Sequence, residues 1–232
     1  MTDFSFVIVS IIPARGGSKA IPKKNVMPFL GQPLITYSIK QSQQSKLVDR
    51  TYVSTDDDHI AEVSREAGAK IIDRPDELAR DTSSTEEALL HALDAIEESP
   101  EIIVLLQCTS PLRRTNEIDD AIQLVKTGDY NSALSCSEDH SFYWENNDGS
   151  AEPINYDPAE RKRRQELEQW YQENGSIYVM ERGILENNNS RLGGKIGIHE
   201  MPKELSFEID TPEDYRIVES IGKNIEFAAK NS

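Results

Sequence analysis

The chain has 232 residues, a formal net charge of −16 and 37% hydrophobic residues, which suits an α/β domain with a polar surface. Its longest mainly apolar stretches, residues 6–12 and 102–106, are seven and five residues long, whereas a transmembrane helix needs about 20. The acidic charge argues against nonspecific nucleic-acid binding, because such binding requires many basic groups to neutralise phosphates. We therefore expect neither a membrane nor a nucleic acid as a partner.

The sequence near the N-terminus lacks the features of a secretory leader, because Asp3 precedes the first apolar run and Pro13 ends it. The two cysteines, Cys108 and Cys136, form no CxxC motif and cannot build a disulfide framework. The four histidines have no metal-ligand spacing such as HExxH. These features predict a cytoplasmic protein without a histidine-based zinc site.

Positive charge is concentrated in the first fifth of the chain. Residues 4–48 contain no Asp or Glu, and their basic residues are Arg15, Lys19, Lys23, Lys24, Lys40 and Lys46. In a strongly acidic chain, such a segment favours a small anionic ligand over an accident of composition.

Hydrophobic patterning predicts strands at residues 6–12, 50–54, 70–72, 102–106, 133–136, 176–180 and 196–200. Helices are expected at residues 33–45, 57–67, 84–98, 116–126 and 211–229, where Pro33, Ser84 or Thr85, Asn116 and Thr211 provide typical helix starts. This alternation predicts an α/β fold with a doubly wound, mainly parallel sheet. Residues 138–173 are polar and too many for a plain connection, so we expect a small hairpin or excursion there.

The loop after the first strand carries glycines and cations, in the sequence Arg15-Gly16-Gly17-Ser18-Lys19, followed by Pro22-Lys23-Lys24-Asn25. Loops at the carboxyl ends of strands form ligand sites in open α/β sheets, and glycines let backbone N–H groups approach an oxyanion. The spacing fits neither GxGxxG nor GxxxxGK[ST], which excludes the dinucleotide fingerprint and the P-loop. On this pattern alone, an anion site and a solvated basic turn remain alternatives.

The segment IIPARGGSKAIPKKNVMPFLGQPLI resembles the opening motif of the acylneuraminate cytidylyltransferase family, the CMP-N-acetylneuraminate synthetases. The resemblance continues in the family's order through VSTDDDHIAEVSREAGA, RPDELARDTSST, LLQCTSPLR, ENGSIYV and FEIDTPEDY, and it spans nearly the whole chain. It implies a Rossmann-like, GT-A-like nucleotidyltransferase fold that activates an acidic nine-carbon 2-keto sugar with CTP, giving a CMP-sugar and pyrophosphate. It also implies Mg²⁺ or Mn²⁺ as cofactor, one domain over residues 1–232, and a homodimer whose excursion, at about 138–174, closes the neighbouring sugar site.

The resemblance assigns the nucleotide site to two groups of residues. The first group, which would hold the CTP triphosphate and position the nucleotide, comprises Arg15, Gly16, Gly17, Ser18, Lys19, Lys24 and Asn25. The second group, which would contact the cytosine, comprises Arg74, Ser83 and Thr85. Ser83 and Ser84 are also typical of a helix N-terminus, and both roles can coexist.

The metal and the acceptor sugar are assigned to residues later in the chain. Glu208 and Asp210, in FEID, stand at the family's two metal-ligand positions. Side chains two residues apart on an extended segment leave the same face and can converge on one hard cation. The alternative interpretation is that the two carboxylates only precede the next helix and bind no metal. The residues implied to bind the acceptor are Gln107, Arg164, Gln172 and Asn174, and those implied to act in catalysis are Arg15, Lys24 and Asp210.

Several positions depart from the family pattern. Glu208 replaces a frequent Asp, and Cys108 replaces a Pro, where we expect no catalytic role for the thiol. Trp144 stands where sialic acid enzymes can place a lysine, and Gln172 replaces an arginine, which removes two cations that would meet a sugar carboxylate. Two alternatives therefore stay open. One is a nucleotidyltransferase of the same fold for legionaminic acid, pseudaminic acid or a sugar phosphate with another NTP; the other is a non-catalytic nucleotide-binding protein.

Overall fold

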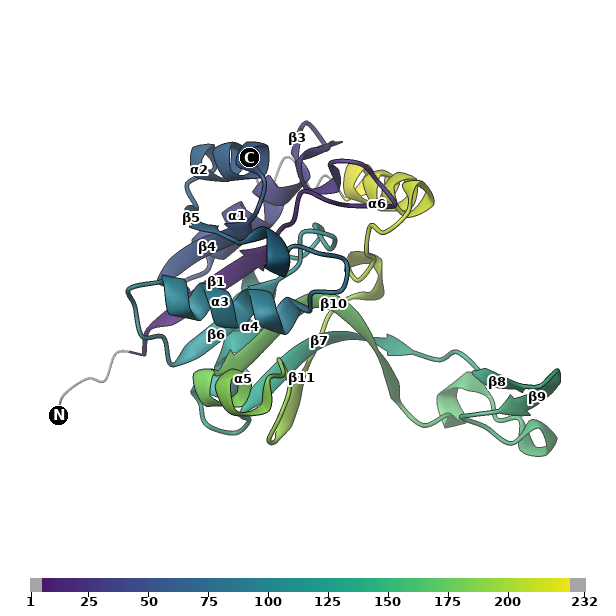
Figure 1. Ribbon diagram of the computed structural model, residues 1–232. Coiled ribbons are helices and arrows are strands. Elements are labelled where there is room, and N and C mark those ends of the chain that lie inside the picture. The colour runs from purple at the N-terminus through teal and green to yellow at the C-terminus, as the bar shows by residue number, and fades with distance from the viewer. Residues whose placement is uncertain (1–5, 226–232) are drawn as a thin grey trace.

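The computed structural model describes residues 6–225, which form a seven-stranded sheet, helices on its two faces and a projecting arm (Figure 1). The strands, in spatial order, are β11 (Ile196–Glu200), β7 (Ser132–Asp139), β10 (Trp170–Glu181), β6 (Ile102–Leu106), β1 (Ile8–Pro13), β4 (Arg50–Thr55) and β5 (Lys70–Asp73). Neighbouring strands are parallel except at β10, which runs antiparallel to β6 and β7. The expected mainly parallel α/β fold is confirmed.

Two apolar clusters fill the two sides of the sheet. The helices on one side are α1 (Leu34–Gln44), α2 (Asp58–Glu66), α4 (Thr115–Lys126) and α6 (Pro212–Asn224), and those on the other side are α3 (Thr85–Ala95) and α5 (Arg182–Asn188). Strand β1 serves both clusters, because Ile8 and Ile12 face the first and Val9 and Ile11 face the second. The sheet is thus doubly wound, and burying each such side chain contributes about 1.5–3 kcal/mol.

Most helix boundaries follow their sequence signals. Ser84 and Thr211 form capping boxes at the starts of α3 and α6, as their positions predict. The expected cap at Asn116 is wrong: α4 begins at Thr115 after Arg114, and the Asn116 amide instead donates to Asp120 on the next turn. Helix α3 also ends early, because the backbone at Ile96 is already extended. Residues 226–229 of the expected last helix lie outside the described residues.

The polar excursion is an arm, residues 140–169, that projects away from the sheet between the extended ends of β7 and β10 (Figure 1). It contains the expected hairpin, formed by β8 (Trp144–Asn147) and β9 (Ser150–Pro153), and the 3₁₀ helices η3 (Pro158–Glu160) and η4 (Arg164–Glu166). Strand β10 begins at Trp170, earlier than expected, because its largely exposed first residues pair with the end of β7.

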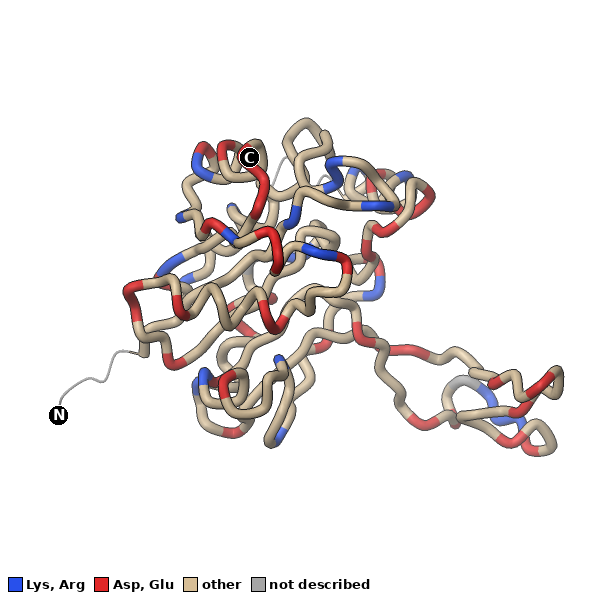
Figure 2. The backbone as a smooth tube through the Cα atoms, in the orientation of Figure 1, with Lys and Arg blue, Asp and Glu red and all other residues tan. Residues whose placement is uncertain are grey.

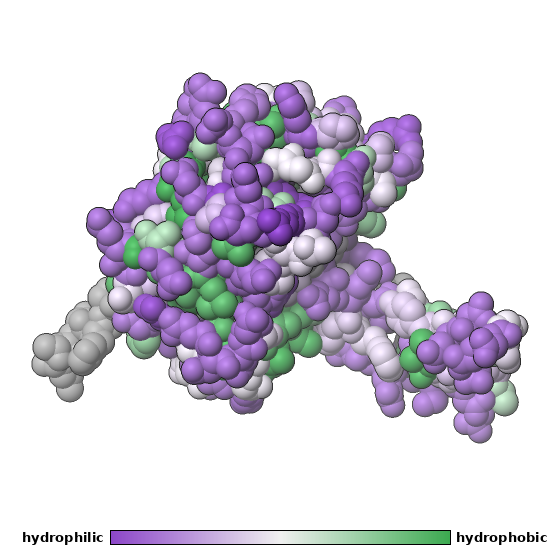
Figure 3. Space-filling view, in the orientation of Figure 1, coloured by the Kyte–Doolittle hydropathy of each residue, from purple (hydrophilic) through white to green (hydrophobic). Residues whose placement is uncertain are grey.

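The short elements gather where β1, β4 and β6 end. The loop after β1 contains η1 (Lys24–Val26) and a hairpin of β2 (Pro28–Phe29) and β3 (Gln32–Pro33), while η2 (Asp76–Leu78) and η5 (Lys203–Leu205) lie before α3 and α6. Figure 2 shows basic positions of the loop after β1 facing acidic positions near the start of α6. The face seen in Figure 3 is mostly hydrophilic, as the net charge suggests. Within residues 6–225, no helix has the length and apolar character that crossing a bilayer requires.

Candidate active site

Two cations of the loop after β1 share one carboxylate partner. Arg15 Nη2 lies 2.9 Å from Asp81 Oδ1, and Lys19 Nζ lies 2.5 Å from Asp81 Oδ2. The hydrogen bond from Lys19 holds the pKa of Asp81 below its ordinary value. Asp81 is 43% exposed and Lys19 is 76% exposed, and ion pairs at such exposure contribute little to stability. A polyphosphate can therefore replace Asp81 at small cost, in a loop where Gly17 and Ser18 lie between the two cations.

The path of this loop depends on Gly16 and Asn25. The Gly16 N–H donates to Asp56 Oδ1 at 3.1 Å, and a Cβ at Gly16 would lie only 2.7 Å from Asp57 Oδ2. The buried Asn25 donates through Nδ2 to the Arg15 carbonyl at 3.0 Å. Glycine thus permits the close approach to α2, and Asn25 fixes the backbone that presents Arg15.

Lys24 reaches from this loop to the segment before α6. Its Nζ donates to the Ile209 carbonyl and to Asp210 Oδ1, both at 3.0 Å. The Lys24 side chain is 13% exposed, compared with 63% for Asp210. A nearly buried ammonium must be compensated by hydrogen-bonding partners, and these two oxygens provide that compensation. The structure therefore joins a predicted phosphate ligand directly to a predicted metal ligand.

Glu208 and Asp210 flank Ile209, which anchors their segment. Ile209 is fully buried, and its N–H donates to the Thr109 carbonyl at 2.8 Å. With Ile209 pointing into the core, its two neighbours share the opposite face. Burial and the nearby Asp210 carboxylate raise the pKa of Glu208 to about 7. The two carboxylates are thus brought together, as the sequence predicted.

The donor set of this pair fits a hard divalent cation. Mg²⁺ commonly takes one or two protein carboxylates and completes its octahedron with waters and substrate phosphates. Among residues 6–225, no group of three or more His, Cys, Asp or Glu side chains forms a metal cage. Glu208 and Asp210 therefore fit an ion that arrives with a nucleotide better than a permanently bound structural metal.

Of the residues expected to bind cytosine, Ser83 and Thr85 lie at the N-terminus of α3, whereas Arg74 directly follows β5. Arg74 Nη2 donates to the Ser54 carbonyl at 2.5 Å, whereas its buried Nε has no hydrogen-bond partner among the described residues. Burial lowers the pKa of Arg74, although Asp56 offsets part of that effect. Ser83 donates to the Glu77 carbonyl at 3.0 Å. Thr85 is the first residue of α3, so its backbone lies at the helix end that attracts anions and electron-rich groups.

Gln107 directly follows β6 and is held by the buried Arg113. Arg113 Nη2 donates to the Gln107 carbonyl at 2.6 Å, and Nε donates to Ser176 Oγ at 2.9 Å. Its Nη1 reaches Ser38 and Gln41 at 2.8 and 3.1 Å. Burial lowers the pKa of Arg113 to about 10. Arg113 is fixed by neutral oxygens and positions the backbone of Gln107.

A bulge in β10 brings Gln107 and Glu208 to the same place. The pairing of β10 with β7 shifts between Glu173 and Tyr178, and Gly175 in between has a φ of +62°. A Cβ at Gly175 would lie 1.6 Å from Glu208 Oε1 and 3.0 Å from Gln107 Oε1. Glycine is required here both by the backbone conformation and by the two side chains that pack on it.

Asn174 maintains this bulge with its own side chain. Its Oδ1 accepts from Ser135 Oγ at 2.6 Å and from the Ser176 N–H at 3.2 Å, and its Nδ2 donates to Ser206 Oγ at 3.0 Å. Asn174 is 4% exposed. The structure thus gives Asn174 a positioning role, and its expected contact with the acceptor sugar stays a prediction.

A cavity of about 350 Å³ lies between β10 and the segment before α6. Its walls include the expected residues Gln172, Asn174, Glu208 and Asp210, together with Glu173 and Lys203. The sequence predicted no site role for Glu173 or Lys203. Glu173 belongs to the ENG motif but had no assigned role, and Lys203 belongs to no motif that we identified. The cavity brings expected acceptor and metal residues to one surface.

Arg164 and Trp144 belong to segments of the arm. The backbone of Arg164 lies in η4, and Trp144 is 48% exposed on β8, in the arm that extends away from the sheet (Figure 1). The side chain of Arg164 lies outside what the structure describes, so its expected contact with the sugar stays a prediction. Cys108 is buried next to Gln107, and burial raises the pKa of its thiol to about 12, which keeps it unreactive.

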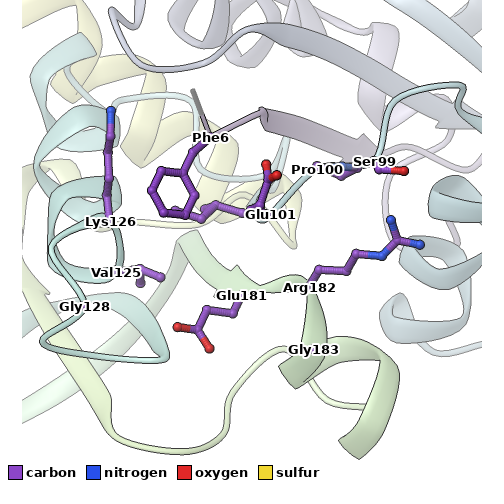
Figure 4. A pocket seen from close by; sticks show the side chains of 11 residues that line it. Phe6, Ser99, Pro100, Glu101, Val125, Lys126, Gly128, Glu181, Arg182 and Gly183 are labelled. Atoms are coloured by element: carbon purple, nitrogen blue, oxygen red, sulfur yellow. The ribbon is translucent and has the colours of Figure 1, made fainter. Parts of the chain in front are cut away.

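A larger cavity of about 500 Å³ lies at the opposite ends of the strands, where β1 and β6 begin. Figure 4 shows Phe6 and Val125 beside the charged side chains of Glu101, Glu181 and Arg182 around it. None of the residues that we expect to bind nucleotide, sugar or metal lines this cavity. Volume alone is therefore a poor guide to the site in this fold, where ligands bind at the carboxyl ends of the strands.

Two solved structures with this architecture match nearly the whole chain. A CMP:2-keto-3-deoxy-manno-octonic acid synthetase complexed with CTP superposes with a TM-score of 0.71 at 20% identity, covering 94% of this chain and 99% of that one. The 4-diphosphocytidyl-2C-methyl-D-erythritol synthase of Anaerococcus prevotii gives a TM-score of 0.67 at 13% identity, covering 94% and 97%. At these identities, the likeness establishes the fold.

Sequence comparison is more specific. N-acylneuraminate cytidylyltransferase A of Danio rerio is 35% identical over 222 residues, covering 91% of this chain and 50% of that protein. The N-acylneuraminate cytidylyltransferase of Streptococcus agalactiae is 31% identical over 212 residues, covering 89% and 51%. The chain thus spans about half the length of these relatives. The family model described as "Cytidylyltransferase" matches residues 9–231, and this chain belongs to that family.

Proposed function

We propose that the protein transfers the cytidylyl group of CTP to an acidic nine-carbon 2-keto sugar of the N-acylneuraminate type, giving a CMP-sugar and pyrophosphate. The contact of Lys24 with Asp210 carries this proposal, because it brings the expected triphosphate loop and the expected metal carboxylates to one point. The names of the relatives, N-acylneuraminate cytidylyltransferase, support the substrate class.

In this reaction, the anomeric hydroxyl oxygen of the sugar bonds to the α-phosphorus of CTP. The bond between that phosphorus and the bridging oxygen of the β-phosphate breaks, and the hydroxyl proton passes to water. Such transfers depend on positioning and charge neutralisation rather than on a covalent intermediate. Arg15, Lys19 and Lys24 would hold the triphosphate and stabilise the departing pyrophosphate, while Gly16, Gly17 and Ser18 would form the backbone that passes close to it.

The remaining residues would orient the two substrates. Arg74, Ser83 and Thr85 would bind the cytosine, and Gln107 would contact the acceptor sugar in the cavity lined by Gln172. A Mg²⁺ or Mn²⁺ ion bound by Glu208 and Asp210 would neutralise phosphate charge and favour ionisation of the acceptor hydroxyl. Asn25 and Asn174 would position the loops that carry these groups.

We also propose a homodimer in which the arm at about 138–174 closes the site of a second copy. The arm that contains the Arg164 backbone projects away from the sheet of its own chain (Figure 1). In the proposed dimer, Arg164 of one copy would therefore reach the sugar carboxylate bound by the other copy. Residues 1–232 would form one nucleotidyltransferase domain, and the arm would be an excursion from it. A cytoplasmic location stays a prediction from the two cysteines, both free and buried.

A second candidate acceptor class has its own support. Gln172 contributes no charge to the cavity, whose walls include the carboxylates of Glu173, Glu208 and Asp210. Because the second arginine of the family pattern is absent at this position, legionaminic acid, pseudaminic acid and a sugar phosphate with another NTP stay alternative acceptors.

Pyrophosphate release, measured for CTP, UTP, ATP and GTP against a panel of acceptors, tests the proposal. The panel contains N-acetylneuraminate, legionaminate, pseudaminate, a neutral N-acetylhexosamine and its 1-phosphate. We expect turnover with CTP and an acidic 2-keto sugar. A preference for the hexosamine 1-phosphate would contradict the acceptor class, and no turnover with any pair would favour the non-catalytic alternative.

A further inference from the structure

The cavity at the candidate active site is strongly acidic. Four carboxylates line it, from Glu173, Glu208, Asp210 and Asp214, and Lys203 is the one lysine or arginine on its walls among the described residues. An acidic sugar brings a further negative charge, and a carboxylate that leaves water needs a cation or several hydrogen-bond donors. Binding of an acidic sugar in this cavity therefore depends on whether Lys203 can reach the sugar carboxylate.

Lys203 has a fixed backbone and an exposed side chain. Lys203 is the first residue of η5. Before it, the Met201 N–H donates to the Cys136 carbonyl at 2.7 Å, and after it, Leu205 is buried. Its side chain is 59% exposed, and Nζ lies 3.4 Å from Asp139 Oδ1. That distance is at the long end for a hydrogen bond, so the ammonium is held loosely at the edge of the cavity.

Asp139 does not depend on Lys203 for its compensation. The Tyr143 hydroxyl donates to Asp139 Oδ2, and Ser141 donates to Oδ1 through Oγ at 2.8 Å and through its N–H at 3.2 Å. Lys203 can therefore turn towards a ligand without leaving a buried carboxylate unpaired. Lys24, in contrast, is 13% exposed and already donates to two oxygens at 3.0 Å.

We propose that Lys203 binds the carboxylate of the acidic acceptor and determines the preference of this site for acidic sugars. This inference rests on the proposed function and adds a cation from the same chain that carries the metal carboxylates. It explains how a cavity with a neutral Gln172 and several carboxylates accepts an anion. Lys203 binds the substrate and takes no part in the bond-making step.

The test compares Lys203→Met with Lys203→Arg and with Lys195→Met, which removes an exposed lysine that lies 4.7 Å from the ring of Tyr130 and outside the cavity. Each variant is assayed with CTP, with the preferred acidic acceptor and with the carboxamide analogue of that acceptor. Removing a charge-assisted hydrogen bond should raise the acceptor KM by about tenfold or more, with the CTP KM within about twofold of wild type. Lys203→Arg should restore most of the affinity, and Lys195→Met should match the wild type.

The carboxamide separates recognition from a structural effect. We expect the wild type to prefer the carboxylate and Lys203→Met to lose at least tenfold of that preference, with a melting temperature near that of the wild type. An unchanged preference in Lys203→Met, or equal rises in the KM of CTP and acceptor with a lowered melting temperature, would overturn the assignment. A wild-type protein that turns over only sugar phosphates would contradict the proposed function itself, and the assignment with it.

Discussion

Lys24 and Asp210 are 186 positions apart in the chain, yet Lys24 Nζ lies 3.0 Å from Asp210 Oδ1. The contact joins the loop after β1 to the segment before α6. It gives Lys24 two oxygen acceptors and Asp210 one cation, and in the proposed function a nucleotide and a metal ion would compete for these groups. The first two predictions concern the two sides of this ion pair.

Replacing Lys24 by Ala should weaken CTP binding and turnover together. A charge-assisted hydrogen bond to phosphate contributes about 1.5–3 kcal/mol, so we expect kcat/KM for CTP to fall by about 10- to 150-fold. Lys23→Ala is the matched control, because Lys23 is an exposed neighbour of like charge. Steady-state kinetics and calorimetric CTP titration measure the effect. An unaltered CTP affinity in the Lys24→Ala variant would show that Lys24 does not bind the triphosphate.

Replacing Asp210 by Asn should abolish metal-dependent turnover while CTP binding persists. An amide is a neutral and poorer ligand for a hard cation than a carboxylate. We expect kcat to fall by at least about 100-fold, with CTP affinity measured in the absence of metal within a few-fold of wild type. Glu213→Gln, which changes an exposed carboxylate paired with Arg216, serves as the control. If the Asp210→Asn variant kept its rate and Mg²⁺ dependence, Glu208 and Asp210 would not be the metal ligands and would only be acidic residues before α6.

Replacing Gly175 by Ala should reduce activity more than its backbone strain explains. Both Gly175 and Gly128 have positive φ, +62° and +81°, but a Cβ meets Glu208 Oε1 at 1.6 Å at the first and nothing within 4 Å at the second. The backbone strain of about 1–2 kcal/mol is common to both alanine variants. We expect a similar loss of melting temperature in both and a further fall in kcat only for Gly175→Ala, because Glu208 must move. Equal activity in the two variants would contradict this account.

The arm is anchored at Asp139, and its contribution should depend on pH. Burial alone would raise the pKa of Asp139, but hydrogen bonds from Tyr143, Ser141 and Lys203 lower it to about 2. A carboxyl whose pKa is lower in the folded state stabilises the fold above its unfolded pKa and loses that effect as the pH falls towards 2. Urea unfolding should show Asp139→Asn less stable than the wild type at pH 6, with a smaller difference at pH 3.

The control for this prediction is Asp94→Asn, which changes an exposed carboxylate on α3. Its difference from the wild type should be small at both pH values, because exposed surface substitutions change stability little. A difference for Asp139→Asn that stays constant or grows between pH 6 and pH 3 would exclude Asp139 as the anchor.

Local patterns predicted most of the fold from the sequence. Apolar runs located the central strands, and the capping residues Ser84 and Thr211 located two helix starts. Helix α5 escaped prediction because it has seven residues and buries only Leu185. The first residues of β10 also escaped prediction, because they pair with β7 through their backbone while their side chains are largely exposed.

Motifs predicted Lys24 and Asp210 as site residues, and the structure places these two side chains in contact. What the sequence lacked was the packing between distant segments. Nothing local shows that Gly175 must be glycine because Glu208 lies against it, or that the Arg113 guanidinium donates to five neutral oxygens. The same holds for Lys203, which reaches the cavity only because η5 packs beside the end of β7.

The measurement that tests the central claim most directly is ³¹P NMR of the complete reaction with CTP and an acidic 2-keto sugar. Cytidylyl transfer predicts that the three CTP resonances give way to one phosphodiester resonance and pyrophosphate in a 1:1 molar ratio, only when acceptor and divalent metal are both present. Formation of CDP with orthophosphate or a sugar phosphate would instead show attack at the γ-phosphorus. That result would contradict the proposed function.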